Sequence, residues 1–455
     1  MSDHPTTPTQ GRPRSGCQRW EAQRWLVDVA IRTDGIEWDQ PRIGYTIRPI
    51  GVDASMDFNW VSQRVHKFAD LTPVFAAAAR RRERLAVEAE AVGRLITARE
   101  HFFIAALLWL SAEWSIFENN ALLDELDAKK NECYAAWGRH AGHHVERVDI
   151  PFGNGYLPAW FHLPPGYDGR PVPAVLSCGG MDAPKELQVA MYGDKFLERG
   201  MAVLAIDGPG QGESPVHGVY VTESNWIDAG QAMVDYLAAR PEIDAERMGA
   251  YGISFGSFWM SQVAATQPRL KGCAVAAVCH EPGSRTLFEE ASPTFKARYM
   301  WMAGMDDEDE FDRMAARLDL RPLFPDMTVP WLAVAGEADE LSPIDHTYKL
   351  AAICGAPSSL LVFQDERHAF SGAPATVLGP NWMSWICDWL YDRVNGEPAT
   401  EEFVFVTSDG AQDSREHPRS GRLAQDAPPL HTMITTNDGL LTKSADATTA
   451  RRRRT

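Results

Sequence analysis

Several features are scarce or absent in this 455-residue chain, and each absence argues against a class of protein. The seven cysteines are scattered and form no Cys-x-x-Cys pair, so we expect neither a disulfide framework nor a structural zinc site. Lys and Arg number 44 against 62 Asp and Glu, and the resulting net charge of −18 disfavours binding to nucleic acid. The same charge disfavours docking on an anionic membrane surface.

Long hydrophobic runs are also missing. The longest apolar run, residues 102–110, is far shorter than the ~20 residues that a membrane-spanning helix needs. The first twenty residues are polar and lack the apolar stretch of a signal peptide. We therefore expect a cytoplasmic protein with no membrane partner.

The chain divides into a helical part and a part in which strands and helices alternate. Residues 1–19 predict a disordered arm, and apolar residues at three- and four-residue spacing predict helices over 20–144. Short β-rich runs alternate with amphipathic segments over 145–396, which predicts an open, mostly parallel sheet with helices on both faces. The interval 281–327 is too long for one crossover and predicts an inserted sub-domain. Both signals fade afterwards, so 397–455 is predicted to be mostly disordered.

The most informative motif is GISFG at residues 252–256, between a predicted strand and a predicted helix. Gly-x-Ser-x-Gly in that context is typical of a nucleophile elbow, a sharp turn that exposes a serine hydroxyl. Glycines are needed beside the serine because larger side chains would collide with the strand and the helix. The N-terminus of the following helix favours negative charge at this point. Ser254 is therefore the candidate nucleophile.

A serine nucleophile needs a histidine as general base and an acid that orients it, and in this arrangement the acid precedes the histidine. Two loops that follow predicted strands offer Asp339 as the acid and His368 as the base. Such loops meet at the edge where parallel sheets build their sites. Glu337 is the rival acid. His346 is the rival base, although it lies too close in sequence to Asp339 to face a separate serine easily.

A second glycine motif supplies a candidate oxyanion hole. The segment CGGMD follows an earlier predicted strand, and glycines there let backbone N–H groups turn inward. We expect the N–H group of Met181, with that of Gly180, to stabilise an oxyanion together with the N–H group of Phe255.

Two further patterns are considered and set aside. The loop DGPGQG at 207–212 lacks the spacing of a dinucleotide-binding loop, and Pro209 removes an N–H group that a phosphate would need. We therefore expect no cofactor and regard this loop as scaffold. His140, His143 and His144 resemble a metal cluster, but they have little carboxylate support and follow the end of a predicted helix, so we expect no metal site.

These motifs stand in the order found in the α/β-hydrolase superfamily, which the chain resembles over residues 145–395. Within it, the segments CGGMDAPKE, DGPGQGES and GRLITAREHFFIAALLWLSAEW are similar to one subgroup. That subgroup holds 2,6-dihydroxypseudooxynicotine hydrolase, fungal polyketide-shortening hydrolases and the fermentation-respiration switch protein. The resemblance implies an α/β-hydrolase fold with an N-terminal helical cap domain, and an active site in the cleft between the two.

The resemblance also implies an activity, because several members of the subgroup cleave carbon–carbon bonds next to a carbonyl and others are esterases. We therefore expect a serine hydrolase acting on a small molecule. Carbon–carbon cleavage in an aromatic or polyketide-like ketone is favoured over ester hydrolysis, and a non-catalytic binding protein is the weaker alternative. Glu281, Glu289 and Glu290 are candidates for an acidic pocket residue that members use. Trp109, on a predicted cap helix, is a candidate for lining an aromatic cleft. The sequence leaves a homodimer open.

Overall fold

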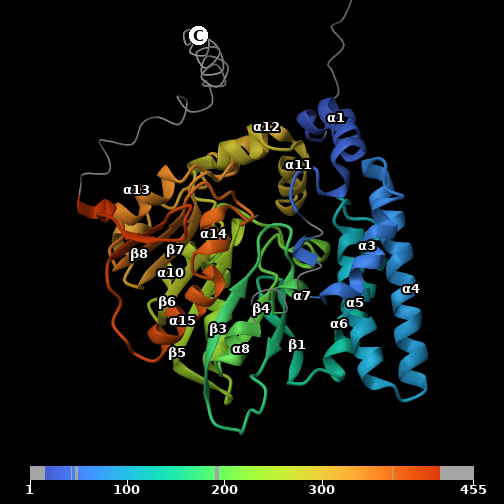
Figure 1. The fold of residues 1–455 in the computed structure, drawn as a ribbon, viewed down its shortest axis with the longest axis horizontal. Coiled ribbons are helices and arrows are strands. Elements are labelled where there is room, and N and C mark those ends of the chain that lie inside the picture. Colours follow the sequence, from blue (N-terminus) through green and yellow to red (C-terminus); the bar gives the residue numbers. More distant parts are fainter. Residues whose placement is uncertain (1–15, 42–43, 47–49, 190–193, 371, 421–455) are drawn as a thin grey trace, which may run out of the picture.

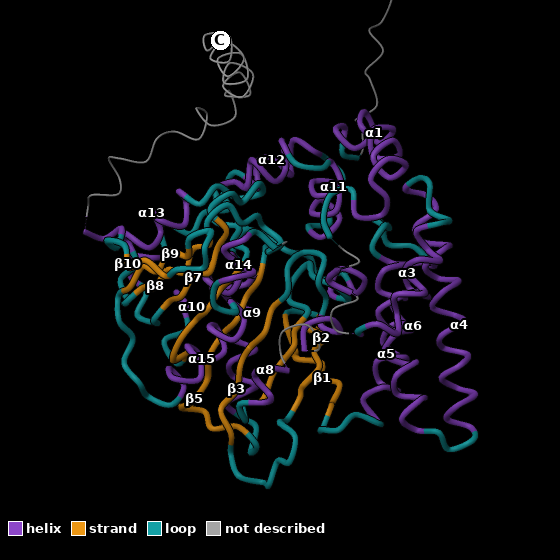
Figure 2. Tube along the Cα trace, in the orientation of Figure 1, coloured by secondary structure: helices purple, strands orange, loops and turns teal. Residues whose placement is uncertain are grey.

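The computed structural model describes residues 16–41, 44–46, 50–189, 194–370 and 372–420. A bundle of helices stands beside a large sheet that is itself flanked by helices (Figure 1). Figure 2 shows α3, α4, α5 and α6 standing together on the right, beside the orange strands, which have further purple helices among them. The sequence prediction of a helical part followed by a strand–helix part is reproduced in this arrangement.

The helical part is built around one central helix. Its main elements are α1 (Gln18–Asp34), α3 (Ser55–Ser62), α4 (Leu71–Ala91), α5 (Leu95–Glu113) and α6 (Ala121–Arg139). α5 packs against both α4 and α6, and almost all of its second half is buried. Among the described residues, α5 is the one helix long and apolar enough to cross a membrane, yet 61% of its apolar window is buried inside the protein. Its central place in the bundle therefore accounts for its apolar composition.

The sheet is mixed and mostly parallel, which confirms the predicted fold class. Its strand order is β1-β2-β4-β3-β5-β6-β7-β8-β9-β10. The strands are β1 (Val145–Phe152), β2 (Gly155–His162), β3 (Val172–Cys178), β4 (Ala202–Ile206), β5 (Ile243–Ile253), β6 (Leu270–Ala276), β7 (Trp331–Gly336), β8 (Ser358–Phe363), β9 (Glu402–Val406) and β10 (Gln412–Ser414). The strands from β4 to β9 run parallel, whereas β1, β2 and β10 are antiparallel to their neighbours.

The central strands are buried on both faces, as parallel strands between layers of helices should be. The remaining helices are α7 (Lys185–Gln188), α8 (Asp194–Glu198), α9 (Asn225–Ala238), α10 (Phe255–Thr266), α13 (Asp345–Ile353), α14 (Pro374–Leu378) and α15 (Trp382–Val394). In β4, Ala202 and Leu204 belong to one hydrophobic cluster and Val203 and Ala205 to another, because successive side chains point to opposite faces. The second cluster also contains Leu107 of α5. The core of the helical part is therefore continuous with one face of the sheet.

The predicted insertion at 281–327 contains α11 (Pro293–Met302) and α12 (Glu308–Ala315). α11 packs against α1, and α1 starts beside α12, where the backbone N–H of Gln18 donates to Glu308 Oε2 at 2.7 Å. The insertion thus connects the sheet with the amino-terminal helix. The predicted disordered arm of residues 1–19 is therefore wrong from Gln18 onward. Residues 1–15 lie outside the described residues.

The prediction for the carboxyl-terminal segment needs a larger correction. Disorder was predicted over 397–455, but β9 pairs with β8 in parallel and β10 pairs with β9. Phe403 of β9 lies opposite Leu360 and is buried in the core. Strand formation here depends on a partner about forty residues earlier in the chain, so local composition did not reveal it. The rest of the segment, residues 421–455, lies outside the described residues.

Candidate active site

Ser254 occupies a strained turn between β5 and α10. Its backbone has φ 55° and ψ −128°, a region that residues other than glycine rarely adopt. A Cβ atom on Gly252 would lie 2.2 Å from the carbonyl oxygen of Gly256, and one on Gly256 would lie 2.4 Å from that of Gly179. Side chains are excluded at both positions, as the elbow motif requires. The turn places the serine at the start of α10, beside the loop that follows β3.

A chain of hydrogen bonds leads from Ser254 to a buried carboxylate. Ser254 Oγ lies 2.9 Å from His368 Nε2, and His368 Nδ1 lies 2.9 Å from Asp339 Oδ2. The other carboxylate oxygen, Oδ1, accepts hydrogen bonds from the backbone N–H groups of Leu341 and Ser342 at 2.9 and 3.0 Å. These contacts fix Asp339 so that it accepts the proton of Nδ1. Nε2 is then the ring atom that accepts the serine hydroxyl.

The electrostatics of His368 suit a general base. Burial by itself disfavours the imidazolium, but the charge and hydrogen bond of Asp339 outweigh burial, with a smaller contribution from Glu340. The pKa of His368 is therefore raised above its ordinary value. Unusual backbone conformations surround this histidine, because Asp365 and Phe370 have φ 56° and φ 48°. Strained residues of this kind cluster at functional sites.

The two rival residues from the sequence lie elsewhere. Glu337 Oε2 accepts the backbone N–H of Asp365 at 3.3 Å. His346 lies in α13, where burial lowers its pKa and the charge of Glu281 opposes that shift. The hydrogen-bonded partner of His368 is thus Asp339, and the histidine beside Ser254 is His368.

The predicted oxyanion residues surround the serine. A Cβ atom on Gly180 would lie 2.7 Å from Ser254 Cβ, so the loop passes directly over the nucleophile. Met181 lines the same pocket, and Phe255 is the first residue of α10. The first N–H groups of a helix have no acceptor within the helix, which leaves the Phe255 N–H available to an oxyanion. This geometry is compatible with the predicted roles, and the roles remain predictions.

Sequence reasoning missed Gln211, which it treated as scaffold. This side chain is fully buried, and its Nε2 donates to the carbonyl oxygens of Gly179 and Gly180, both at 2.8 Å. Its Oε1 accepts a weak hydrogen bond from Cys178 Sγ at 3.6 Å. Gln211 therefore holds the backbone of the loop that passes over Ser254. The only available signal was a polar residue in a glycine-rich loop after a strand.

Arg298 of α11 joins three parts of the molecule beside this loop. Its side chain is buried and donates to the carbonyl oxygen of Met181 at 3.1 Å and to that of Trp114, just after α5, at 2.9 Å. It also pairs with Asp182 Oδ1 at 2.9 Å, an atom that accepts the Trp114 indole N–H at the same distance. The insertion, the helical part and the loop after β3 therefore meet at Asp182.

A pocket opens over Ser254 and His368, and we call it the proximal chamber. It encloses about 690 Å³, counting the part open to solvent. Its lining comes from all three parts of the molecule, for example Tyr45 of the helical part, Met181 of the sheet part and Phe295 of the insertion. Most lining side chains are apolar, as in most small-molecule sites.

The four candidate substrate residues, Glu281, Glu289, Glu290 and Trp109, are absent from the described lining of the proximal chamber, and we correct that prediction. Glu281 accepts the backbone N–H of Thr286 at 2.7 Å, and Glu289 pairs with Lys296 at 2.7 Å. Trp109 is buried inside the helical part and donates to Glu83 at 3.2 Å. Their side chains are directed into local contacts, which spacing along the chain could not reveal.

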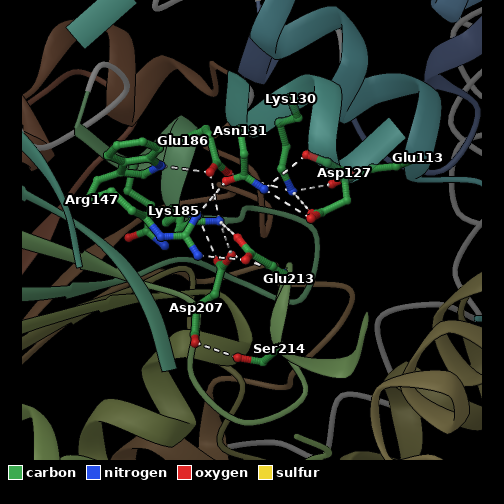
Figure 3. A network of polar contacts seen from close by, with 12 residues as sticks. Glu113, Asp127, Lys130, Asn131, Arg147, Lys185, Glu186, Asp207, Glu213 and Ser214 are labelled. Carbon is green, nitrogen blue, oxygen red and sulfur yellow. Dashed lines mark hydrogen bonds and ion pairs between the residues drawn. The ribbon is translucent and has the colours of Figure 1, made fainter. Parts of the chain in front are cut away.

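A second group of buried charges, the ion cluster, lies where α5 and α6 meet the loops after β3 and β4 (Figure 3). It consists of Glu113, Asp127, Lys130, Arg147, Lys185, Glu186, Asp207 and Glu213. Lys185 Nζ lies 2.8 Å from Glu186, 3.0 Å from Asp207 and 2.7 Å from Glu213. Lys130 pairs with Asp127 at 2.7 Å and Glu113 at 2.9 Å. Each carboxylate named here thus has a cation of the chain beside it.

Within the described residues, one group of side chains could hold a metal ion: Asp127, Glu213 and His217, whose ligand atoms lie within 4.8 Å of one another. Glu213 already pairs with Lys185 and Arg147, so this position is electrostatically satisfied. The histidines considered from the sequence have separate partners. His140 contacts Glu90 at 2.7 Å, and His143 contacts His162 at 2.9 Å.

Comparison with known proteins shows the family to which the chain belongs. The model of the FrsA-like esterases matches residues 82–314, half of the chain. The chain belongs to the FrsA-like esterase family. It is a hydrolase, and the similarity to the subgroup predicted from the sequence is confirmed.

Curated relatives show the same relationship. The chain is 27% identical over 311 residues to 2,6-dihydropseudooxynicotine hydrolase of Paenarthrobacter nicotinovorans, an alignment that covers 66% of this chain and 78% of the relative. It is 31% identical over 210 residues to 20-hydroxy-prefusarin hydrolase FUS2 of Gibberella moniliformis, which covers 43% of this chain and 48% of that protein. The alignment thus spans about half the length of the fungal relative.

A solved structure supports the fold. The crystal structure of 2,6-dihydroxy-pseudo-oxynicotine hydrolase superposes with a TM-score of 0.67 at 24% identity, and the match covers 79% of this chain and 98% of that one. The α/β-hydrolase fold with helical additions is therefore shared along most of both chains.

Proposed function

We propose that Ser254, His368 and Asp339 form a catalytic triad that hydrolyses a carbon–carbon bond next to a carbonyl in an aromatic or polyketide-like ketone. The observation that carries this proposal is the hydrogen-bonded chain from Asp339 through His368 to Ser254, which ends in an apolar chamber. A hydroxyl with this arrangement is activated by its neighbouring base.

The reaction proceeds in two stages. His368 Nε2 removes the proton of Ser254 as Oγ attacks the substrate carbonyl, and the oxyanion is stabilised by the N–H groups of Met181 and Phe255. The bond between the carbonyl carbon and its neighbour then breaks, and the departing carbon takes the proton from His368. Water, deprotonated by His368, attacks the acyl-enzyme and releases a carboxylic acid and free Ser254. Because the departing carbon must carry a developing negative charge, it needs a second carbonyl or an aryl group to delocalise that charge.

Ester hydrolysis is the second candidate, and the description of the family as esterases favours it. The same residues serve both reactions, because only the leaving atom differs. A non-catalytic binding protein is a weaker alternative, since it needs no aligned serine, imidazole and carboxylate.

A screen by mass spectrometry distinguishes these functions. Aryl ketones, diketones and aryl esters would be incubated with the wild-type protein and with Ser254→Ala. Hydrolysis of diketones or aryl ketones that depends on Ser254 supports the proposal, and turnover of esters alone supports the second candidate. Unreduced turnover by Ser254→Ala would refute the mechanism for both.

A further inference from the structure

A second chamber adjoins the proximal chamber on the side of the helical part, and we call it the distal chamber. It encloses about 550 Å³, again counting open space. The two chambers share Tyr45, Asp182 and Leu187 in their linings, so they adjoin at these residues. The distal chamber is otherwise enclosed by side chains of the helical part alone.

The border between the chambers is close to the nucleophile. Asp182 is two residues after Gly180, whose backbone lies against Ser254. Since consecutive Cα atoms are about 3.8 Å apart, the Cα atoms of these two residues are separated by at most about 7.6 Å. The loop that borders both chambers therefore passes beside the nucleophile, so the distal chamber adjoins the reacting end of the site.

The chemistry of the distal chamber is aromatic and nearly neutral. Phe58 and Phe75 line it with ring centroids 6.0 Å apart, and Trp38 and Trp114 line it with centroids 5.8 Å apart. In the described lining of both chambers Asp182 is the one carboxylate, and no lysine or arginine occurs. Because Asp182 is already paired with Arg298, it does not offer an unpaired charge to a ligand.

We propose that the distal chamber receives the far end of an elongated, uncharged aromatic substrate whose scissile carbonyl lies at Ser254. The ring of the substrate packs among Phe58 of α3, Phe75 of α4 and the indole rings of Trp38 and Trp114. This proposal rests on the proposed hydrolase function, because Ser254 defines the reacting end. It narrows the substrate class to molecules that fill both chambers.

The test compares short and long substrates of the same chemistry. The pairs are 1-phenylbutane-1,3-dione with 1-(biphenyl-4-yl)butane-1,3-dione, and phenyl acetate with phenyl 5-phenylpentanoate, and the long member of each pair has one more ring. Burial of an additional ring is expected to raise kcat/KM of the wild-type protein for the long member by at least about tenfold. A ratio near one for both pairs would overturn the proposal.

Variants of the chamber wall test whether the preference for long substrates arises in the distal chamber. Ser111→Phe, on the wall formed by α5, is expected to reduce the long-to-short ratio of kcat/KM by at least about tenfold, and the milder Ser111→Leu by less. Ile96→Phe adds the same ring to the same helix at a site that is 67% exposed, and should leave the ratio unchanged. A ratio that does not respond to either substitution of Ser111 would contradict the proposal.

Binding to the Ser254→Ala protein separates this proposal from the catalytic one. Calorimetry with the two diketones should show that the long ligand binds at least about tenfold more tightly than the short one. If this preference is observed but Ser254 is dispensable for turnover, the distal chamber stands and the catalytic mechanism fails. If Ser254 is essential but no preference is observed, the mechanism stands and the distal chamber is wrong.

Discussion

The molecule buries two groups of ionisable side chains, and they differ in what surrounds them. In the ion cluster, Lys185 has three carboxylates within 3.0 Å, and its side chain is fully enclosed by protein. In the candidate catalytic group, Asp339 and His368 are also buried, but their chain of hydrogen bonds ends at a hydroxyl that lines the proximal chamber. Burial and perturbed pKa values occur in both groups. Access to a pocket is what distinguishes the candidate site from the structural one.

The ion cluster lies at the boundary between the helical part and the sheet part. Glu113, Asp127 and Lys130 come from the helical part, whereas Lys185 begins α7 and Asp207 follows β4 in the sheet part. Lys130 approaches Glu186 at 3.9 Å, which extends the contacts across the boundary. Burial, which outweighs the attraction of Lys130, raises the pKa of Glu113 to about 7. We infer that the cluster fixes how the helical part sits against the sheet, and that the catalytic group performs the chemistry.

The largest expected effect is a loss of turnover when the candidate catalytic group is altered. Ser254→Ala should lower kcat by ~10³-fold or more, because it removes the nucleophile while the fold is retained. The measurement is turnover of the best substrate, together with thermal unfolding. His346→Ala is the matched control, because that histidine was the rival base and lies outside the hydrogen-bonded chain. Equal losses in the two variants would contradict the assignment.

The second-largest effect should be a loss of unfolding free energy when the ion cluster is broken. Lys185→Met leaves Asp207, Glu186 and Glu213 without their shared cation, and breaking a buried ion pair costs about 3–5 kcal/mol of unfolding free energy. Urea denaturation measures this loss. Lys271→Met removes a half-buried lysine whose partner, Glu246, is exposed, and it should cost less than about 1 kcal/mol. Similar midpoints for both variants would show that the ion cluster does not stabilise the fold.

A smaller effect should arise from Gln211, which lies between the two groups. Gln211→Ala removes both hydrogen bonds to the loop carbonyls, worth about 1–3 kcal/mol together, and loosens the backbone that faces Ser254. We expect kcat to fall by about tenfold with KM nearly unchanged. Gln231→Ala, at an exposed position of α9, provides the control. A loss of stability without a change in kcat would make Gln211 merely structural.

The smallest predicted effect is a displacement of the pH profile. His368 must be neutral to accept the serine proton, so activity should rise with pH through its pKa. Because that pKa is raised, the acidic limb of kcat/KM should lie above about 6.5, the ordinary value for histidine. Asp339→Asn removes the carboxylate that raises the pKa, so any residual activity should persist to lower pH. An acidic limb unchanged by this substitution would contradict the role of Asp339.

The sequence predicted the features whose geometry is encoded locally. The elbow around Ser254 depends on two glycines within four residues, and Asp339 and His368 each follow a strand that ends at the same edge of the sheet. The continuous apolar run of β4 and the apolar segment of α5 were recognisable for the same reason. These patterns constrain the backbone without any knowledge of distant contacts.

The features that were missed depend on side-chain direction or on distant partners. Gln211 acts through carbonyl groups about thirty residues earlier in the chain, and Glu289 turns toward Lys296 instead of the pocket. β9 exists because β8 offers it a free edge. Trp109 is aromatic and helical, yet its position on α5 directs it to Glu83 inside the bundle. Composition and spacing carry no information on such contacts.

The most direct test of the account is covalent labelling of the serine. A fluorophosphonate probe should modify the wild-type protein once, and peptide mass spectrometry should find the adduct on Ser254. His368→Ala should label much more slowly, and Ser254→Ala should not label. A protein that turns over substrate while Ser254 stays unmodified, or that carries the adduct on another residue, would contradict the central claim.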